Sequence, residues 1–322
     1  MQKRILSGIQ PSGKLHIGNY FGAICQHIAL QDQGEAFYFI ANYHALTTLQ
    51  DAAKLRELTL DVAIDYLALG LSPEKAILFR QSDVPEVTEL AWLLSTVTGM
   101  GLLERAHSYK DKVAKQISPK VGLFTYPVLM AADILIYQSD IVPVGADQVQ
   151  HIEMTQDMAG YFNSTYSQEI FKRPEAKLNE TAKVSGTDGQ KMSKSYGNTI
   201  EIFAEGNALK KVVMGIVTDS TPVESPKDPE ANIVFQLYTL FATPTEKQEM
   251  RERFLAGGYG YGEAKKALLK KIDEYFAPAR LRRKELASDK AYVEEVLSKG
   301  AIRAREEASK TIKAARRACG ID

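Results

Sequence analysis

The sequence predicts an α/β fold, in which a parallel sheet with crossover helices is followed by a helical region. Short apolar runs at residues 5–8, 37–40 and 77–80 are separated by 30 to 40 residues with helical patterns. Such alternation is typical of a parallel sheet. After about residue 205 the strand pattern fades, and the helical patterns are interrupted by Pro222, Pro226, Pro229, Pro244, Gly257-Gly258 and Pro278.

Two helices of the first half are predicted from their caps and their apolar faces. Asp51 can cap a helix that ends at Gly70, and we expect this helix to lie on the sheet. Pro85 suits the first turn of a second, scaffold helix, with Trp92 beside its apolar face. The apolar faces comprise Leu55, Leu58, Val62, Tyr66 and Leu69 in the first helix and Val87, Leu90, Ala91, Leu94 and Val97 in the second.

Composition and charge are those of an ordinary globular protein. The 322 residues are 45% hydrophobic and 25% charged, and 40 Lys and Arg balance 40 Asp and Glu. Contact with nucleic acid must therefore come from local patches. The two cysteines, Cys25 and Cys319, predict neither a disulfide nor an iron–sulfur site. Because no signal-like start and no run of about 18 apolar residues occurs, we expect a cytoplasmic protein without membrane contact.

A glycine-rich junction of strand, turn and helix occupies residues 7–20, directly after the first apolar run. Gly8 and Gly13 permit tight backbone paths, and Gly18 leaves room for a flat ligand at the helix start. Free N–H groups and the helix dipole favour an anion there, and His16 adds a donor for a phosphate oxygen. A glycine-rich turn is often only structural, and a lone histidine at a helix start is more often a cap or a core residue.

A polar loop at residues 186–196 carries two lysines, Lys191 and Lys194, three positions apart. The loop is either an exposed charged surface or a phosphate-binding element. In the second case both ammonium groups neutralise the negative charge that gathers on the α-phosphate and the leaving pyrophosphate of ATP. Nearby glycines would let the loop close over the nucleotide.

Two further segments are rich in basic residues. Residues 104–120 carry five Lys and Arg against two acidic residues, and they form either a solvated loop or one that faces phosphates. Residues 301–318 have a local excess of four positive charges, which is either a solvated helix face or a contact for nucleic acid.

The two glycine-containing motifs together resemble the HIGH and KMSKS signatures of class I aminoacyl-tRNA synthetases. Residues 191–195 read KMSKS, and residues 16–19 read HIGN, the ending that is usual in the tryptophanyl branch. Four further blocks are similar to bacterial tryptophanyl-tRNA synthetases, so the resemblance spans nearly the whole chain. These blocks are SGIQPSG at 7–13, LMAADIL at 129–135, VPVGADQ at 142–148 and GYG at 258–260.

The resemblance implies a Rossmann-like catalytic domain at 1–205, with a helical insertion near 104–185, and a helical region at 206–322 that meets the tRNA anticodon. It further implies a homodimer that uses ATP with Mg²⁺, L-tryptophan and tRNA(Trp). The reaction would have two steps, formation of tryptophanyl-adenylate and transfer to tRNA, with no protein nucleophile. Two rival interpretations stay open, a tyrosyl-tRNA synthetase and a catalytically silent paralogue that binds RNA.

The family also implies which residues meet ATP. The catalytic groups would be His16, Lys112, Lys191 and Lys194, and no residues are expected to bind a metal directly. Ala146 stands where relatives usually have an acidic residue, so only a backbone contact can survive there. The loop before Lys191 is shorter than in relatives. The residues implied for ATP are Gln10, Pro11, Ser12, Gly18, Asn19, Gly145, Ala146, Asp147, Val184, Lys191, Met192, Ser193, Lys194 and Ser195.

Asp133 lies in an otherwise apolar helical segment, residues 128–136, where an unpaired buried carboxylate would cost several kcal/mol, so it needs a donor. The family assigns it the indole N–H of tryptophan, and the alternative is a salt bridge to a neighbouring helix. Such a site rejects phenylalanine by roughly 10⁴–10⁵, but tyrosine could also donate to Asp133. Leu6 stands where relatives usually have phenylalanine. The other residues implied for tryptophan are Leu6, His44, Met130, Val142 and Val144 around the ring and Tyr126 and Gln148 near the amino group.

Overall fold

The computed structural model describes residues 2–106, 109, 120–178 and 184–322, which form two compact units. Unit 1 comprises Met1–Gly13, Gln26–Asn179 and Leu286–Asp322, and unit 2 comprises Lys14–Cys25 and Glu180–Glu285. These units are defined by packing, so the functional division at residue 205 stays a prediction. No helix among the described residues is long and apolar enough to cross a membrane.

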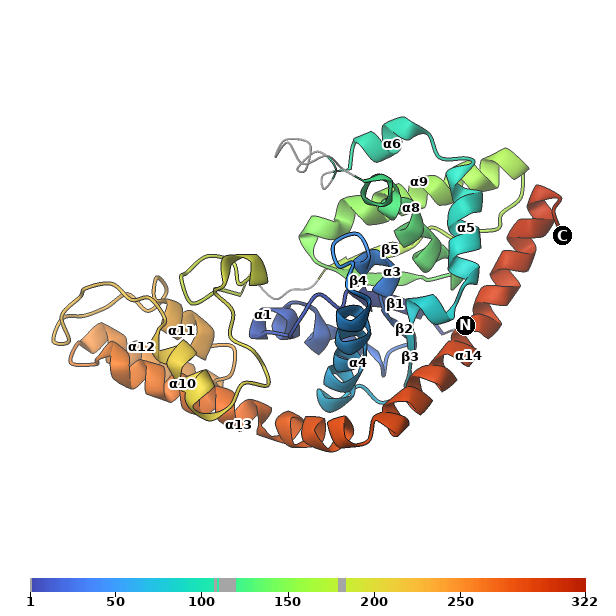
Figure 1. The fold of residues 1–322 in the computed structure, drawn as a ribbon. Coiled ribbons are helices and arrows are strands. Elements are labelled where there is room, and N and C mark those ends of the chain that lie inside the picture. The colour runs from blue at the N-terminus through green and yellow to red at the C-terminus, as the bar shows by residue number, and fades with distance from the viewer. Residues whose placement is uncertain (1, 107–108, 110–119, 179–183) are drawn as a thin grey trace. The chain divides into compact units, whose positions relative to one another are not determined.

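Unit 1 is built on a parallel sheet of five strands in the order β3-β2-β1-β4-β5 (Figure 1). The predicted parallel sheet and the three predicted strands are confirmed. β1 lies in the middle of the sheet, and the chain turns to opposite sides of it to add further strands. The strands are β1 Arg4–Ile9, β2 Glu35–Ile40, β3 Ala76–Arg80, β4 Ile141–Val144 and β5 Glu175–Leu178.

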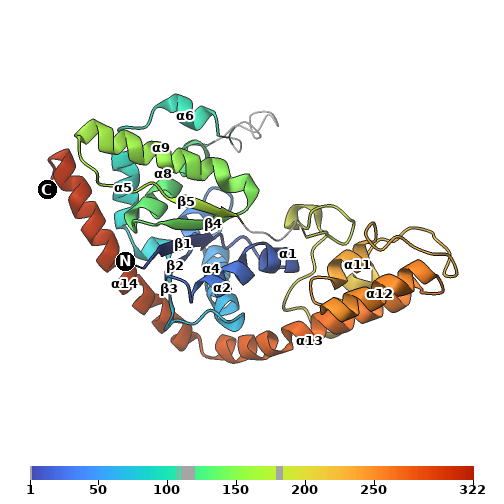
Figure 2. The same ribbon diagram turned by 180° about the vertical axis from the view of Figure 1, so that it is seen from behind.

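The side chains of β2 alternate between two covered faces of the sheet, as a strand period of two requires. Phe37 and Phe39 belong to the core cluster that contains α5, α8 and α9, whereas the hydroxyl of Tyr38 donates to the carbonyl of His27 on α2 at 2.8 Å. Helices α2 and α4 therefore lie on the other face (Figure 2). Besides α1 Ile17–Asn19, the α-helices among the described residues up to 166 are α2 Cys25–Leu30, α3 Asn42–Ala45, α4 Ala52–Ala68, α5 Glu86–Ser95, α6 Met100–Glu104, α8 Val121–Ile136 and α9 Val149–Tyr166.

The two predicted helix starts are confirmed. Asp51 caps α4, because its Oδ1 accepts from the backbone N–H of Lys54 at 2.9 Å, and Pro85 is the residue directly before α5. An aspartate cap satisfies one of the free N–H groups of the first turn, and proline has no N–H to leave unsatisfied there.

Helix α14, Lys290–Cys319, packs along the edge strand β3 and against α5 in unit 1. At the crossing, a Cβ added to Gly300 would lie 1.9 Å from the carbonyl oxygen of Leu78, so only glycine allows this approach. The basic residues of α14 are partly paired inside unit 1: Arg305 lies 2.8 Å from Glu86 and Arg316 lies 2.7 Å from Glu89. The excess charge predicted for residues 301–318 is thus reduced by acidic residues of α5.

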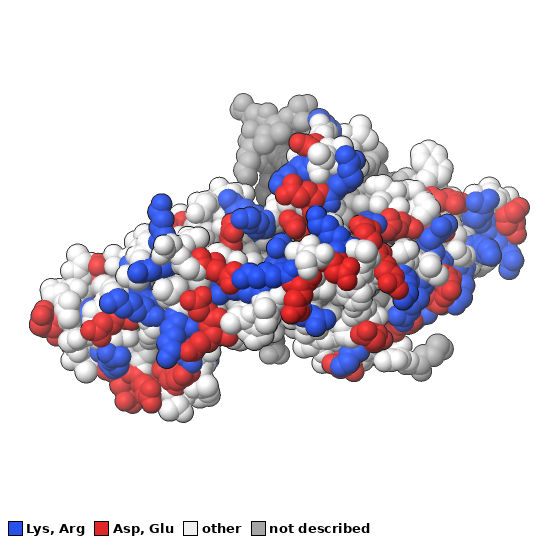
Figure 3. Space-filling model, turned by 60° about the horizontal axis from the view of Figure 1, so that its bottom comes forward, with Lys and Arg blue, Asp and Glu red and all other residues white. Residues whose placement is uncertain are grey.

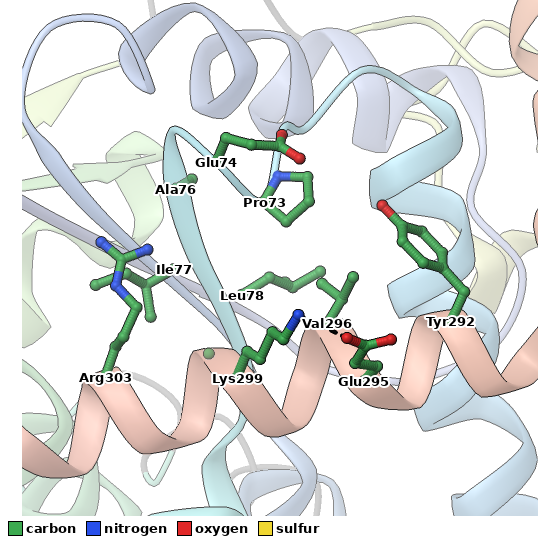
Figure 4. A pocket seen from close by; sticks show the side chains of 11 residues that line it. Pro73, Glu74, Ala76, Ile77, Leu78, Tyr292, Glu295, Val296, Lys299 and Arg303 are labelled. Carbon is green, nitrogen blue, oxygen red and sulfur yellow. Dashed lines mark ion pairs between the residues drawn. The ribbon is translucent and has the colours of Figure 1, made fainter.

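A pocket of about 240 Å³ lies between β3 and α14 (Figure 4). Its floor is apolar, and the Glu295–Lys299 ion pair lies at its rim. None of the residues predicted for ATP or tryptophan lines it, so it is separate from the predicted site.

Unit 2 is helical, as predicted for the residues after 205. Its aromatic core joins the start of the chain to α13, since the hydroxyls of Tyr20 and Tyr275 lie 3.0 Å apart and their rings meet edge to face. Thr243 and Glu246 form a capping box at the start of α12. The elements are α1 Ile17–Asn19, the π-helical turn Tyr20–Ile24, α10 Gly206–Met214, α11 Ile233–Tyr238, α12 Pro244–Ala256 and α13 Tyr261–Ser288.

Charges of both signs are interspersed over the face drawn in Figure 3, where Lys and Arg lie among Asp and Glu. This distribution agrees with the formal net charge of zero. Recognition of a polyanion on this face must therefore depend on individual side chains rather than on a broad positive field.

Candidate active site

His16 is held at the start of α1 by a reciprocal pair of hydrogen bonds with Asn19. The His16 Nδ1 accepts from the Asn19 backbone N–H at 3.3 Å, and the His16 backbone N–H donates to Asn19 Oδ1 at 3.1 Å. Asn19, the last residue of HIGN, thus completes a capping box. His16 is thus both a helix cap and a buried residue, as the purely structural interpretation of the sequence predicted. The same hydrogen bonds fix the orientation of its ring.

The protonation state of His16 follows from these contacts. Because Nδ1 is an acceptor, the proton of the neutral ring lies on Nε2, which remains available as a donor. Burial, and then the positive charge of Lys194, lower the pKa of His16 to about 4. At neutral pH the residue is therefore an uncharged N–H donor.

We expect the NMR resonances of the His16 ring to titrate near pH 4, since burial and a nearby cation both disfavour the imidazolium. His16 then stays neutral from pH 5 to 8 and adds no acid limb to the activity in that range. A His16→Gln variant identifies the resonance. Titration of that resonance near 6.5, the ordinary value, would contradict the expectation.

The two sequence motifs meet inside unit 2. The backbone N–H of Gly18 points at the sulfur of Met192, 3.3 Å away, and a Cβ on Gly18 would lie 3.3 Å from the Met192 Cβ. A side chain at this position would crowd both Met192 and the ring of His16, so one of these side chains would have to shift. Met192 is buried, whereas Lys191, Lys194 and Ser195 are exposed and can face a ligand.

The lysine loop is organised by Asn198, a buried residue that sequence reasoning missed. Its Oδ1 accepts from the Ser193 N–H at 2.8 Å, and its Nδ2 donates to Asp188 Oδ1 at 2.7 Å and to the Lys191 carbonyl at 3.2 Å. The hydrogen bond from Asn198 is also the main cause that lowers the pKa of Asp188. Val184 anchors the other side of the loop, because its carbonyl accepts from the Met192 N–H at 2.9 Å.

We expect Asn198→Ala to raise the KM for ATP about tenfold, because three hydrogen bonds that shape the loop, each worth roughly 1 kcal/mol, are lost. The measurement is ATP–pyrophosphate exchange at varied ATP. Gln190→Ala is the matched control, since this exposed side chain lies in the same loop. An equal KM for ATP in wild type and Asn198→Ala would show that Asn198 does not shape the ATP-binding form.

In unit 1, Asp133 is buried and, when it is ionised, accepts hydrogen bonds from two side chains. His44 Nε2 lies 2.8 Å from Oδ2, and Gln81 Nε2 lies 2.9 Å from both carboxylate oxygens. Burial raises the pKa of Asp133, while the hydrogen bonds from His44 and Gln81 oppose that shift. Among the described residues no Lys or Arg pairs with Asp133, but His44 on helix α3 lies within ion-pair distance, so the predicted alternative of a salt bridge to a neighbouring helix stays open.

The other residues predicted for tryptophan gather around Asp133 to different degrees. Tyr126 and Met130 share its face of α8, and the Tyr126 ring meets the His44 ring edge to face at 6.3 Å. The Tyr126 hydroxyl bonds to Nε2 of His151, a second residue that the sequence did not single out. Leu6 and Val142 are buried in one cluster with Met130 and Val144 packed against it, and Gln148 donates to Asp147.

The residues predicted for ATP in unit 1 follow the carboxyl ends of two adjacent strands. Gln10, Pro11 and Ser12 come after β1, whereas Gly145, Ala146 and Asp147 come after β4. His44 lies in α3, which follows β2, and Gln81 lies in the 3₁₀ turn that follows β3. In open parallel sheets, ligands bind at this edge, where the strand order reverses, and here the reversal is at β1. Lys112 lies outside the described residues.

Comparison with known proteins agrees with this geometry. The family model "tRNA synthetases class I (W and Y)" matches residues 2–277. The tryptophan–tRNA ligase of Rhodopirellula baltica is 58% identical over 319 residues, which are 99% of both chains. That of Fusobacterium nucleatum is 57% identical over 99% of this chain and 98% of its own.

Solved structures are similar as well. The tryptophanyl-tRNA synthetase from Campylobacter jejuni, complexed with ADP and tryptophan, has a TM-score of 0.93 and 50% identity over 98% of this chain and 99% of its own. A tyrosyl-tRNA synthetase from Archaeoglobus fulgidus shares only the fold, with a TM-score of 0.68 and 21% identity over 87% and 90% of the two chains. The chain thus belongs to the class I tRNA synthetases for tryptophan and tyrosine.

Proposed function

We propose that this chain is a tryptophan–tRNA ligase, which activates L-tryptophan with ATP and transfers it to tRNA(Trp). The observation that carries the choice of amino acid is Asp133, a buried carboxylate on an apolar helix whose two protein partners both donate to it. It can accept one further N–H, and the indole N–H is a donor without acceptor capacity. Relatives more than 50% identical over the whole chain are named tryptophan–tRNA ligases, which favours this function over the tyrosyl alternative.

In the first step the tryptophan carboxylate attacks the α-phosphorus of ATP, and pyrophosphate leaves. The neutral His16 donates from Nε2 to a phosphate oxygen, while Lys191 and Lys194 neutralise charge on the leaving group. ATP enters as its magnesium complex. Mg²⁺ would be bound through the phosphates of ATP.

In the second step a terminal hydroxyl of the tRNA attacks the acyl carbon of the adenylate, and AMP leaves. No protein nucleophile takes part, so catalysis rests on orientation and on charge stabilisation. Around the reactants, Tyr126 and Gln148 would bind the amino group of tryptophan. The ring would lie among Leu6, His44, Met130, Val142 and Val144.

The residues that we propose to bind ATP are Gln10, Pro11, Ser12, Gly18, Asn19, Gly145, Ala146, Asp147, Val184 and the loop from Lys191 to Ser195. Ala146 has only a methyl group, so its contact is assigned to the backbone. Lys112 is included among the proposed ATP-binding residues on the basis of the sequence alone.

Residues 206–322 would contact the anticodon of tRNA(Trp). Of the six basic residues at 301–318, Arg303 and Lys313 alone form no ion pair in the part of the chain that the structure describes. They are therefore the basic residues of this segment best able to contact phosphates. We also propose a homodimer in the cytoplasm. Three large apolar side chains of unit 1 support the dimer by their exposure, namely Trp92 at 69%, Met100 at 62% and Val121 at 77%.

The test is ATP–pyrophosphate exchange on the purified protein with each of the twenty amino acids, since adenylate formation needs no tRNA. Exchange with tryptophan alone supports the proposed function. Exchange with tyrosine alone keeps the mechanism and overturns the specificity. Exchange with no amino acid favours the paralogue that binds RNA without catalysis.

A further inference from the structure

Gln81 is the second protein partner of Asp133, and it lies in no recognisable motif. It is 1% exposed and occupies the 3₁₀ turn Gln81–Asp83 that follows β3. Its Oε1 accepts from the backbone N–H of Tyr43 at 3.0 Å, which fixes the orientation of the amide. The amide nitrogen must therefore point at Asp133, where it lies 2.9 Å from both oxygens.

The turn that carries Gln81 is clamped to α3. Asn42 Nδ2 donates to the Ser82 hydroxyl at 2.7 Å, and the Ser82 N–H donates to Asn42 Oδ1 at 3.0 Å. α3 also carries His44, the other donor to Asp133. α3 and the turn after β3 therefore form one hydrogen-bonded unit that aims two side-chain donors at a single carboxylate.

This arrangement bears on how tyrosine is excluded, which the indole N–H contact alone does not explain. Indole nitrogen only donates, whereas a phenol oxygen both donates and accepts. His44 and Gln81 direct their N–H groups at Asp133. The end of the tryptophan site at Asp133 therefore accepts hydrogen bonds from the substrate rather than donating them. The hydroxyl of tyrosine could donate to Asp133. On binding, however, its oxygen would lose a hydrogen bond from water without gaining one from a protein donor in exchange.

We propose that Gln81 is a positioning residue that sets the preference for tryptophan over tyrosine, by holding Asp133 as a fixed acceptor. The inference rests on the proposed function and adds a residue that acts on substrate through Asp133. Without the amide, the carboxylate can turn and can offer a proton of its own. Tryptophan then loses its oriented acceptor, and tyrosine gains a partner.

The experiment compares wild type, Gln81→Met and Ser82→Ala in ATP–pyrophosphate exchange with tryptophan and with tyrosine. Methionine has nearly the same volume as glutamine and lacks the amide donor. Ser82→Ala is the matched control, because it loosens the same turn while leaving the Gln81–Asp133 contact. Gln81→Leu is made in parallel, and thermal unfolding identifies variants that are folded.

In Gln81→Met we expect the ratio of kcat/KM for tryptophan to that for tyrosine to fall about 10-fold to 100-fold, chiefly through the KM for tryptophan. The acid limb of kcat/KM for tryptophan should also move to higher pH, because a hydrogen bond that favours the ionised Asp133 is lost. The titratable groups beside Asp133 are His44 from α3 and Tyr137, the residue directly after the helix of Asp133, and both are unchanged in this variant.

Wild-type exchange with tryptophan is measured first, so a failure of the proposed function appears there, before any variant is compared. An unchanged selectivity ratio in folded Gln81→Met or Gln81→Leu would overturn the role of Gln81. The same fall of the selectivity ratio in Ser82→Ala would show that Gln81 has only a structural role. An acid limb of kcat/KM that does not shift in Gln81→Met would show the same. Either result would overturn the proposed role of Gln81.

Discussion

Replacement of Lys194 by methionine is expected to lower kcat for ATP–pyrophosphate exchange with tryptophan by about 10²–10³. Lys194 is exposed on the loop after Met192, and its charge already influences the pKa of His16. The ammonium is proposed to neutralise charge that develops on the pyrophosphate as it leaves. Since that charge is largest in the transition state, its loss should lower kcat more than it raises the KM for ATP.

The matched control is Lys210→Met, which removes another exposed lysine, from α10 of the same unit. This variant should exchange at the wild-type rate. Equal, small effects of the two replacements would show that Lys194 contributes only to the general charge of unit 2.

Replacement of Asp133 by alanine is expected to abolish the selectivity of activation. A site with one buried acceptor prefers tryptophan to phenylalanine by roughly 10⁴–10⁵, and without the acceptor the two substrates should differ by about tenfold or less. The change also leaves the amide of Gln81 and the ring of His44 without their acceptor, at a cost of roughly 1–3 kcal/mol each in unfolding free energy. The fold itself should persist, because Asp133 packs on a core that is otherwise apolar.

The measurement is kcat/KM in the exchange assay for tryptophan and phenylalanine, with thermal unfolding as the check on folding. Asp133→Asn is the companion variant. It keeps the shape but turns an amide group toward donors, so tryptophan should lose affinity there as well. If Asp133→Ala still discriminated against phenylalanine as wild type does, the assigned role of Asp133 would be wrong.

The central part of the fold could be predicted from the sequence because its signals are local. The buried strands β1, β2 and β3 are short apolar runs, and Asp51 and Pro85 mark helix starts by chemistry that needs no tertiary contact. β5 could not be predicted in this way. Its four residues, Glu175 to Leu178, are mostly exposed, and they form a strand only because β4 offers a free edge.

The packing of α14 likewise could not be predicted from sequence patterns. Its buried side chains are mostly small, among them Ala301, Ala304 and Ala308, so its apolar face is weak by residue type. The basic residues indicated either a solvated face or a contact for nucleic acid, and nothing in the sequence showed that Arg305 and Arg316 have acidic partners on α5. Ion pairs between residues so distant in the chain can be recognised only in the folded structure.

The residues of the candidate site likewise divide into those that have a signal in the sequence and those that have none. Motifs with fixed spacing identified His16, Lys191 and Lys194, and one carboxylate in an apolar helix identified Asp133. Gln81 and Asn198 escaped because a single amide in a turn has no distinctive sequence context. Both are buried with several hydrogen bonds, and that property belongs to the folded chain alone. Their assigned roles, like those of the motif residues, stay predictions for the experiments above.

The close crossing of Gly300 over the Leu78 carbonyl has a consequence for the chain while it is being made. β3 is an edge strand, and unpaired strand edges invite pairing with other chains. The helix that covers this edge is synthesised long after the strand, at roughly 5–20 residues per second. For roughly ten seconds or more a nascent sheet therefore exposes one edge, and newly made chains depend on dilution or chaperones until residue 300 has emerged.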